Sequence, residues 1–163
     1  MLVISFIIAA AAVAADQLLK LYIDKNIAFD EVRKFIPHVL SITHVRNPGA
    51  AWSIMSGKTW FLILLPCVII AASIWFMVKN RHGSKLCMLS LALILGGGIG
   101  NLIDRVRMHE VIDYLKCELF SFPIFNFADI CVVIGAALFC IYMFFFDESE
   151  KKDKKKEAGK DAG

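Results

Sequence analysis

Two aspartates near the start of the last apolar segment could together activate a water molecule. Asp113 lies in the short run VIDYL, and Asp129 follows sixteen residues later in FSFPIFNFADICVV. If the two carboxyl groups converge, like-charge repulsion keeps one protonated while the other stays ionised. The ionised carboxylate can then take a proton from water while the neutral acid polarises a peptide carbonyl. The pair therefore predicts hydrolysis of a peptide bond without a covalent intermediate.

The same two positions also have a structural interpretation. Asp113 could be a solvated loop residue, and Asp129 could be a carboxylate stabilised by the dipole at the N-terminus of a helix. A catalytic set built on histidine is not favoured, because the histidines are scattered in loops, at His38, His44, His82 and His109. The spacing of the aspartates alone leaves both interpretations open.

The elements that must position these aspartates are apolar enough to cross a membrane. Of the 163 residues, 58% are hydrophobic, and the mean hydropathy is +0.65, which is typical of membrane proteins. A helix needs about 20 mostly apolar residues to span a bilayer. This length predicts four spans, at residues 1–23, 60–78, 86–103 and 125–146.

The segment between the first two spans has a different pattern. Alternating apolar and β-branched residues, as in HVLSITHV, are interrupted by Pro37 and by Asn47-Pro48-Gly49. This pattern predicts a small β-rich segment that lies on the membrane surface. The five cysteines show neither a CxxC pair nor a ligand spacing with histidine, so no metal site and no disulfide framework is expected.

Charged residues favour one orientation without deciding it. Lys and Arg number nine on each side of the predicted membrane region. Their density favours a cytoplasmic position for the short basic connection VKNRHGSK and for the tail. Residues 147–163 carry six lysines against six acidic residues, which predicts a solvated, disordered tail.

Polar residues inside an apolar span are costly and usually face the interior of a helix bundle or lie near an interface. In the first span, Asp16 and Lys20 are four residues apart and can form an ion pair on one helix face. We expect this pair to support the structure near the outer end of the helix, with Lys20 extending toward the membrane surface.

The third predicted span ends in LILGGGIGNLIDRVR, which combines small and polar residues. Ala92, Gly96 and Gly100 recur every four residues, a spacing that lets another helix approach closely. A polar trio follows on one helix face at Asn101, Asp104 and Arg105. The glycines indicate packing, whereas the polar trio is a candidate site.

Five motifs along the chain occur in a fixed order. They are DQLLK (16–20), RNPGAAWS (46–53), GGGIGNLIDR (96–105), VIDYL (111–115) and FNFADI (125–130). In this order they resemble the motifs of bacterial lipoprotein signal peptidase, the signal peptidase II family of intramembrane aspartyl peptidases. The resemblance extends over essentially all of residues 1–146, and Pro48 and Trp52 are small departures from the family pattern.

The resemblance assigns roles to residues of this chain. It implies that Asp113 and Asp129 are the catalytic dyad. Residues that bind substrate or support the site would be Asn47, Gly49, Asn101, Arg105 and Asn126. Structural support would come from Asp16, Lys20 and Asp104.

The resemblance also implies a fold, a reaction and a location. The fold would be an all-α membrane protein, with four transmembrane helices and an extracytoplasmic β-cradle at about residues 26–58, in a single domain over residues 1–146. The reaction would remove the signal peptide from a diacylglyceryl-modified prolipoprotein, with cleavage before the lipidated lipobox cysteine. No metal, cofactor or nucleic acid would take part, and the protein would act as a monomer among membrane lipids. Both termini would be cytoplasmic, with the active site near the outer face of the bacterial inner membrane.

Two other classes of function fit parts of the pattern. A proton-coupled small transporter or channel subunit could relay protons through Asp16, Asp113 and Asp129, but it would place carboxylates near the middle of the membrane. A purely structural membrane protein could assemble through the glycine seam, and it would tolerate Asn at both Asp113 and Asp129.

Overall fold

The computed structural model describes residues 1–49, 59–81 and 83–146. Within these residues the helices are α1 (Leu2–Asn26), α2 (Thr59–Lys79), α3 (Lys85–Met108) and α4 (Phe127–Phe145). The strands are β1 (Val32–Ile36), β2 (Leu40–Asn47) and β3 (Val111–Cys117), which form one antiparallel sheet in the order β1-β2-β3. The predicted tail and residues 50–58 of the predicted cradle lie outside the described residues.

The four helices are each long and apolar enough to cross a membrane. α1 and α3 continue beyond the predicted ends of their spans, to Asn26 and Met108. The additional turns contain charged residues, which an apolar pattern does not predict as part of a span. The prediction of a four-helix membrane protein with a small sheet is confirmed. Strand β3 was not predicted, because VIDYLKC does not alternate between apolar and polar residues, and its first four residues are all buried.

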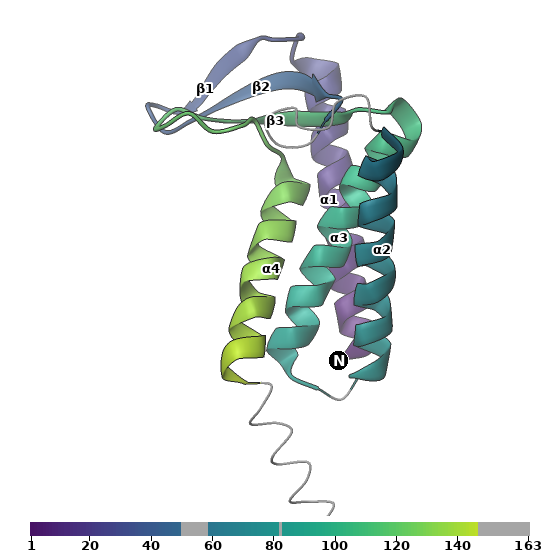
Figure 1. The fold of residues 1–163 in the computed structure, drawn as a ribbon. Helices are drawn as coiled ribbons and strands as arrows, with labels where there is room; N and C mark the ends of the chain where they lie inside the picture. The colour runs from purple at the N-terminus through teal and green to yellow at the C-terminus, as the bar shows by residue number, and fades with distance from the viewer. Residues whose placement is uncertain (50–58, 82, 147–163) are drawn as a thin grey trace, which may run out of the picture.

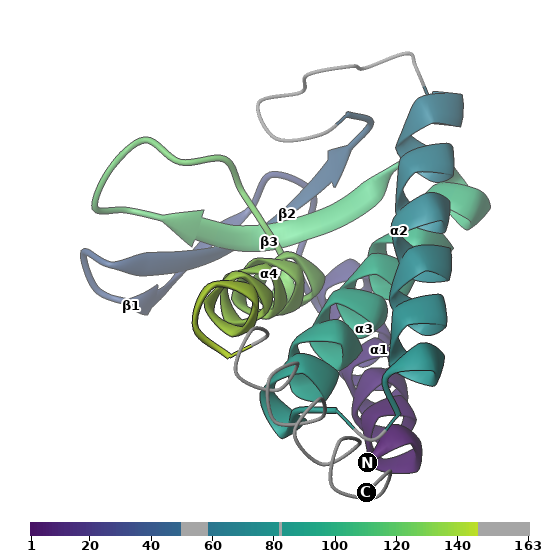
Figure 2. The same ribbon diagram turned by 60° about the horizontal axis from the view of Figure 1, so that its bottom comes forward.

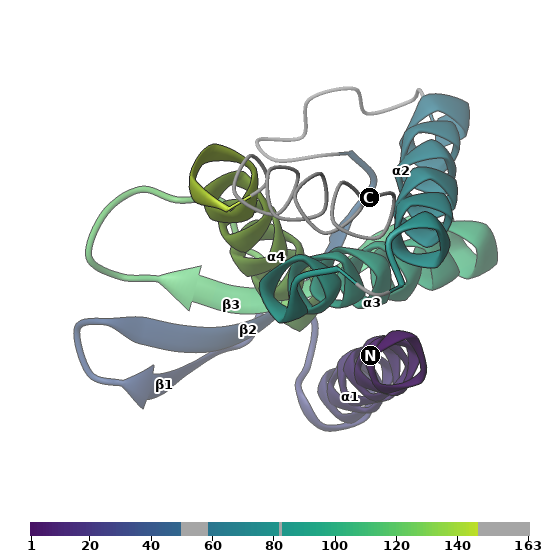
Figure 3. The same cartoon turned by 90° about the horizontal axis from the view of Figure 1, so that it is seen from below.

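Helix α3 lies at the centre of the bundle, with α1, α2 and α4 around it (Figure 3). In α3, half of the residues in an 18-residue apolar stretch are buried inside the protein, whereas in the corresponding stretches of the other three helices the buried share is 17–22%. The peripheral helices therefore present most of their apolar side chains outward, as expected of helices whose solvent is lipid.

Small residues let α3 approach two of its neighbours closely. A Cβ atom added to Gly96 would lie 2.7 Å from the Cβ of Ala12, and one added to Gly100 would lie 2.6 Å from Oδ2 of Asp16. The glycine spacing predicted by the sequence therefore serves packing against α1. Gly97 faces the other way, and a Cβ atom there would collide with the carbonyl oxygen of Ala128 in α4.

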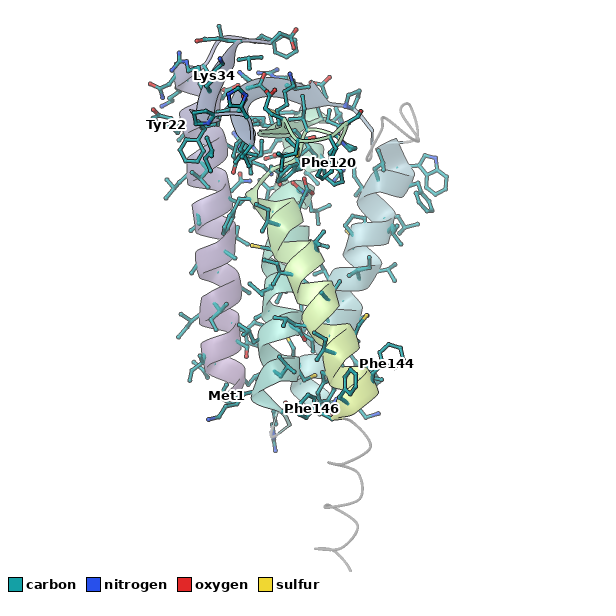
Figure 4. All side chains as sticks on the ribbon, turned by 90° about the vertical axis from the view of Figure 1, so that its left-hand side faces the viewer. Met1, Tyr22, Lys34, Phe120, Phe144 and Phe146 are labelled. Carbon is teal, nitrogen blue, oxygen red and sulfur yellow. The ribbon has the colours of Figure 1, made fainter. Side chains whose placement is uncertain are left out.

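The sheet covers one end of the bundle and extends sideways past α4 (Figures 1 and 2). It is attached to α1 by a buried apolar cluster of Ile23, Ile27, Ile112 and Tyr114. The N-terminus and the connection between α2 and α3 lie at the opposite end (Figure 1). Figure 4 shows the same division, with Tyr22, Lys34 and Phe120 at the sheet end, and Met1, Phe144 and Phe146 at the other.

Candidate active site

A cavity of about 410 Å³ lies where the start of α4, the polar end of α3 and the edge of the sheet meet. Its polar lining consists of Asn47, Asn101, Arg105, Asp113 and Asp129. The remaining lining is apolar and comprises Val111, Phe122, Pro123, Ile124, Phe125, Ile130, Val133 and Ile134. The structure thus brings both predicted catalytic aspartates to one cavity, although they belong to different elements. Apolar residues of α4 continue the wall of this cavity, and Val133 among them is 67% exposed on the outer surface of the helix.

Asp129 is held by the first turn of α4. Asn126 is the N-cap residue, and its side-chain oxygen accepts a hydrogen bond of 3.0 Å from the backbone N–H of Asp129. In return, Oδ2 of Asp129 accepts one of 3.1 Å from the backbone N–H of Asn126, which completes a capping box. The other oxygen, Oδ1, accepts a 2.7 Å bond from Nδ2 of Asn101. Both oxygens of Asp129 therefore accept hydrogen bonds.

Asp113 lies in the middle of β3, opposite Val45 of β2, and only 4% of its surface is exposed. Its Oδ1 accepts a 2.7 Å hydrogen bond from Nδ2 of Asn126, and its Oδ2 accepts a 2.8 Å bond from Nδ2 of Asn47. Burial nevertheless raises the pKa of Asp113 to about 6, and the charge of Asp129 acts in the same direction. Asp113 is therefore a carboxyl group that takes up a proton at about pH 6.

The turn after β2 orients Asn47 toward Asp113. The side-chain oxygen of Asn47 accepts a 2.9 Å hydrogen bond from the backbone N–H of Gly49, an Asx-type turn. This leaves the amide nitrogen of Asn47 to donate to Asp113. Arg105 reaches the same turn, with Nη2 3.4 Å from the carbonyl oxygen of Gly49. The rest of this motif, residues 50–53, lies outside the described residues.

The predicted support residues form a buried ion cluster behind the cavity. Nζ of Lys20 lies 2.9 Å from Oδ2 of Asp16 and 2.8 Å from Oδ2 of Asp104. The expectation that Lys20 extends to the membrane surface is wrong, since the residue is only 2% exposed. Two carboxylates inside the protein neutralise the ammonium group, so it has no need to reach water. Asp16 also accepts a 3.2 Å hydrogen bond from the backbone N–H of Ala128, which joins α1 to the start of α4.

Two further residues complete this arrangement and were not assigned roles from the sequence. Gln17 donates to the carbonyl oxygen of Gly100 at 3.1 Å and to Oδ1 of Asp104 at 3.2 Å. Its only signal in the sequence is a polar side chain within an apolar run. The hydroxyl of Tyr114 accepts a 3.2 Å bond from the backbone N–H of Phe127, and burial raises the pKa of this hydroxyl. Tyr114 belongs to the motif VIDYL, but nothing in the sequence indicated a role for it, because its strand was not recognised.

The geometry is suited to a reaction between water and a carbonyl group. Two carboxyl groups face one cavity, and burial raises the pKa of one of them, Asp113, to about 6. A pair of this kind can supply an acid and a base to one water molecule. Within residues 1–49, 59–81 and 83–146, no group of three or more His, Cys, Asp or Glu side chains is placed to hold a metal ion.

Comparison with known proteins identifies relatives over most of the chain. A family model described as signal peptidase II matches residues 8–145. A lipoprotein signal peptidase of Enterococcus faecalis is 39% identical over 154 residues, covering 94% of this chain and 96% of that protein. A lipoprotein signal peptidase of Listeria welshimeri is 40% identical and covers 90% of this chain and 96% of its own length.

Solved structures show the same architecture. A structure described as a bacterial membrane enzyme superposes with a TM-score of 0.81 at 35% sequence identity, covering 91% of this chain and 90% of that one. A second structure with the same description gives a TM-score of 0.80.

Proposed function

The chain belongs to the signal peptidase II family, and from this premise we propose that Asp113 and Asp129 are the acid and base of an aspartic endopeptidase. The protein is a bacterial membrane peptidase that removes signal peptides from prolipoproteins. The observation that carries the proposed mechanism is the meeting of two carboxyl groups of different burial at one cavity. Asn47, Asn101 and Asn126 hold these carboxyl groups, while Gly49 and Arg105 shape the turn that borders them.

In the proposed reaction, Asp129 is the base and Asp113 the acid. Asp129 accepts a proton from the attacking water, because it is the less buried of the two carboxyl groups that line the cavity. Asp113 donates a hydrogen bond to the oxygen of the scissile carbonyl and stabilises the negative charge that develops there. Asp129 then passes this proton to the nitrogen of the departing amine as the C–N bond breaks, Asp113 keeps its own proton, and no covalent intermediate forms.

The proposed substrate carries a diacylglyceryl group on the cysteine that follows the cleaved bond. Such a residue remains in the bilayer, since each buried CH₂ group is worth about 0.8 kcal/mol. A peptidase for this substrate must therefore keep its carboxyl groups beside lipid. Support comes from the apolar wall of the cavity, which ends in the outward-facing residues Val133 and Ile134 of α4.

We place the sheet and the cavity at the outer face of the membrane, with both termini in the cytoplasm. Basic residues at the opposite end of the bundle, Lys79, Arg81 and Lys85, support this orientation. We also propose a monomer and a single domain over residues 1–146, because one chain supplies both aspartates and all the groups that hold them.

The test of the proposed specificity uses a pair of substrates. We expect purified protein to cleave a diacylglyceryl-modified lipobox peptide before its cysteine, and to cleave the same peptide without lipid at least about tenfold more slowly, because remote binding energy contributes to the rate. Mass spectrometry of the products identifies the bond. Equal rates on both peptides, or cleavage at another bond, would contradict the proposed specificity.

The pH dependence of kcat/KM tests the role of Asp113. Its pKa is raised to about 6, so the free enzyme holds the proton below that pH and loses it above. We expect kcat/KM to fall as the pH rises through about 6, approaching tenfold per pH unit. In Asn47→Ala the carboxylate loses a hydrogen bond, which raises the pKa of Asp113 further and moves the fall to higher pH. A profile that keeps rising to pH 8, or one that Asn47→Ala leaves in place, would exclude Asp113 as the acid.

A further inference from the structure

Lys20 contacts the proposed catalytic machinery as well as the ion cluster. Besides its two carboxylate partners, Nζ of Lys20 donates a 2.8 Å hydrogen bond to the side-chain oxygen of Asn101. Asn101 in turn donates its 2.7 Å bond to Asp129. We infer that Lys20 is a positioning residue for the reaction, which sets the orientation of Asn101 and through it the carboxylate of Asp129. This inference rests on the proposed function of Asp129.

The direction of the hydrogen bonds explains how Lys20 acts. An ammonium group can only donate, so the atom of Asn101 that faces Lys20 must be the oxygen. The amide nitrogen is then directed to the other side, where it meets a carboxylate oxygen that can only accept. Without Lys20 the amide could rotate and present its oxygen to Asp129, and two acceptors would then face each other. The ammonium group of Lys20 is thus the charged donor that fixes which end of the Asn101 amide the base meets.

Asn101 also connects Lys20 to the second aspartate. The oxygen of Asn101 accepts a 3.1 Å hydrogen bond from Nδ2 of Asn126, the same nitrogen that donates to Asp113. Lys20 and Asn126 therefore hold one oxygen from two sides, and all three side chains are at least nine-tenths buried. The orientation of the Asn101 amide therefore affects the hydrogen-bond donors of both Asp129 and Asp113.

A role confined to bracing the helices would have different consequences. Bracing depends on the ion pairs of Lys20 with Asp16 and Asp104, which connect α1 to α3. Positioning depends on the bond from Lys20 to Asn101. Asp104→Asn weakens the first set of contacts and leaves the second in place, so it is the matched control for Lys20→Met.

The experiment is a double-mutant cycle in the peptide assay, with kcat, KM and thermal stability measured for each variant. We expect Lys20→Met to lower kcat by about 10- to 100-fold, the usual range for losing a hydrogen bond to a charged group, with KM little changed. Asn101→Ala should lower kcat similarly. The double variant should be no slower than Asn101→Ala alone, because both changes break the same chain of hydrogen bonds from Lys20 through Asn101 to Asp129. Asp104→Asn should lose thermal stability with a smaller loss of kcat.

If Lys20→Met does not fold, Lys20→Arg takes its place in the cycle. Arginine keeps the charge for both carboxylates, but its planar fork does not reproduce the geometry of the ammonium bond to Asn101. Wild-type kcat in either Lys20 variant, or losses that multiply in full with Asn101→Ala, would overturn the inference. Asp129→Asn in the same assay separates the two proposals. Full activity of Asp129→Asn would contradict the proposed dyad. An inactive Asp129→Asn together with a fully active Lys20 variant would contradict only the role of Lys20.

Discussion

Asp113→Asn and Asp129→Asn are each expected to lower kcat by at least about 10²- to 10⁴-fold, the range that a positioned acid or base contributes. Asparagine has nearly the same size as aspartate and keeps one oxygen as an acceptor at each position, while its NH₂ group takes the place of the other oxygen. It can neither accept a proton from water nor donate one as a carboxylic acid does. The loss should therefore appear in kcat, measured with the lipidated peptide, while the protein remains folded in detergent.

The control for these variants is Asp30→Asn. Asp30 is exposed between α1 and β1 and has a positive φ of 61°, a conformation that asparagine tolerates well. We expect wild-type kcat from this variant. If Asp113→Asn or Asp129→Asn cleaves as fast as Asp30→Asn, the proposed dyad is wrong. A structural membrane protein or a proton relay would then have to be considered again.

Gly97→Ala is expected to have the largest effect on stability. The new Cβ atom would collide with the carbonyl oxygen of Ala128 and would lie 2.8 Å from a methyl group of Val132. Backbone atoms cannot move aside as a flexible side chain does, so α3 and α4 must separate. Overpacking of this kind typically costs about 1–3 kcal/mol. We expect a lower free energy of unfolding in mixed micelles, together with a loss of kcat, because Asn101 and Asp129 lie on the two helices that separate.

The neighbouring residue offers a matched control. A Cβ atom on Gly98 would meet its nearest neighbour, Cγ1 of Ile70, at 3.4 Å, which is an ordinary contact. Gly98→Ala adds the same methyl group to the same helix, and we expect its free energy of unfolding to stay within about 1 kcal/mol of wild type. Equal losses for the two variants would show that the close approach of α3 and α4 is not what limits stability.

Much of this architecture could be predicted from the sequence because lipid imposes simple rules on composition. A bilayer of fixed thickness requires apolar runs of fixed length, so four helices were evident without any knowledge of their packing. Polar residues within such runs are rare, which directed attention to Asp16, Lys20 and Asn101. The pairing of Asp16 with Lys20 was predicted from their spacing, and the role of Asn101 from resemblance in the ordering of motifs.

The rest depended on contacts between distant parts of the chain. β3 resembles neither a helix nor an alternating strand, because both of its faces are covered at its start. Lys20 looked like a residue that would extend to the membrane surface, since one carboxylate partner lies a turn away in the sequence. Its second carboxylate and its amide partner come from α3, more than eighty residues later. Such partners become visible only when the helices are packed.

The capping box at the start of α4 has a consequence for inhibition. Asn126 and Asp129 exchange hydrogen bonds that begin the helix. Asp129 also lines the cavity, and Asn126 also donates a hydrogen bond to Asp113. A change at either residue would disturb the folding of the helix start as well as the proposed chemistry. A small molecule that binds both carboxyl groups therefore leaves the cell few routes to resistance by mutation at the site it occupies. Resistance mutations would have to arise instead in the apolar wall of the cavity. Val133 and Ile134 in that wall have apolar side chains, which neither cap the helix nor form hydrogen bonds.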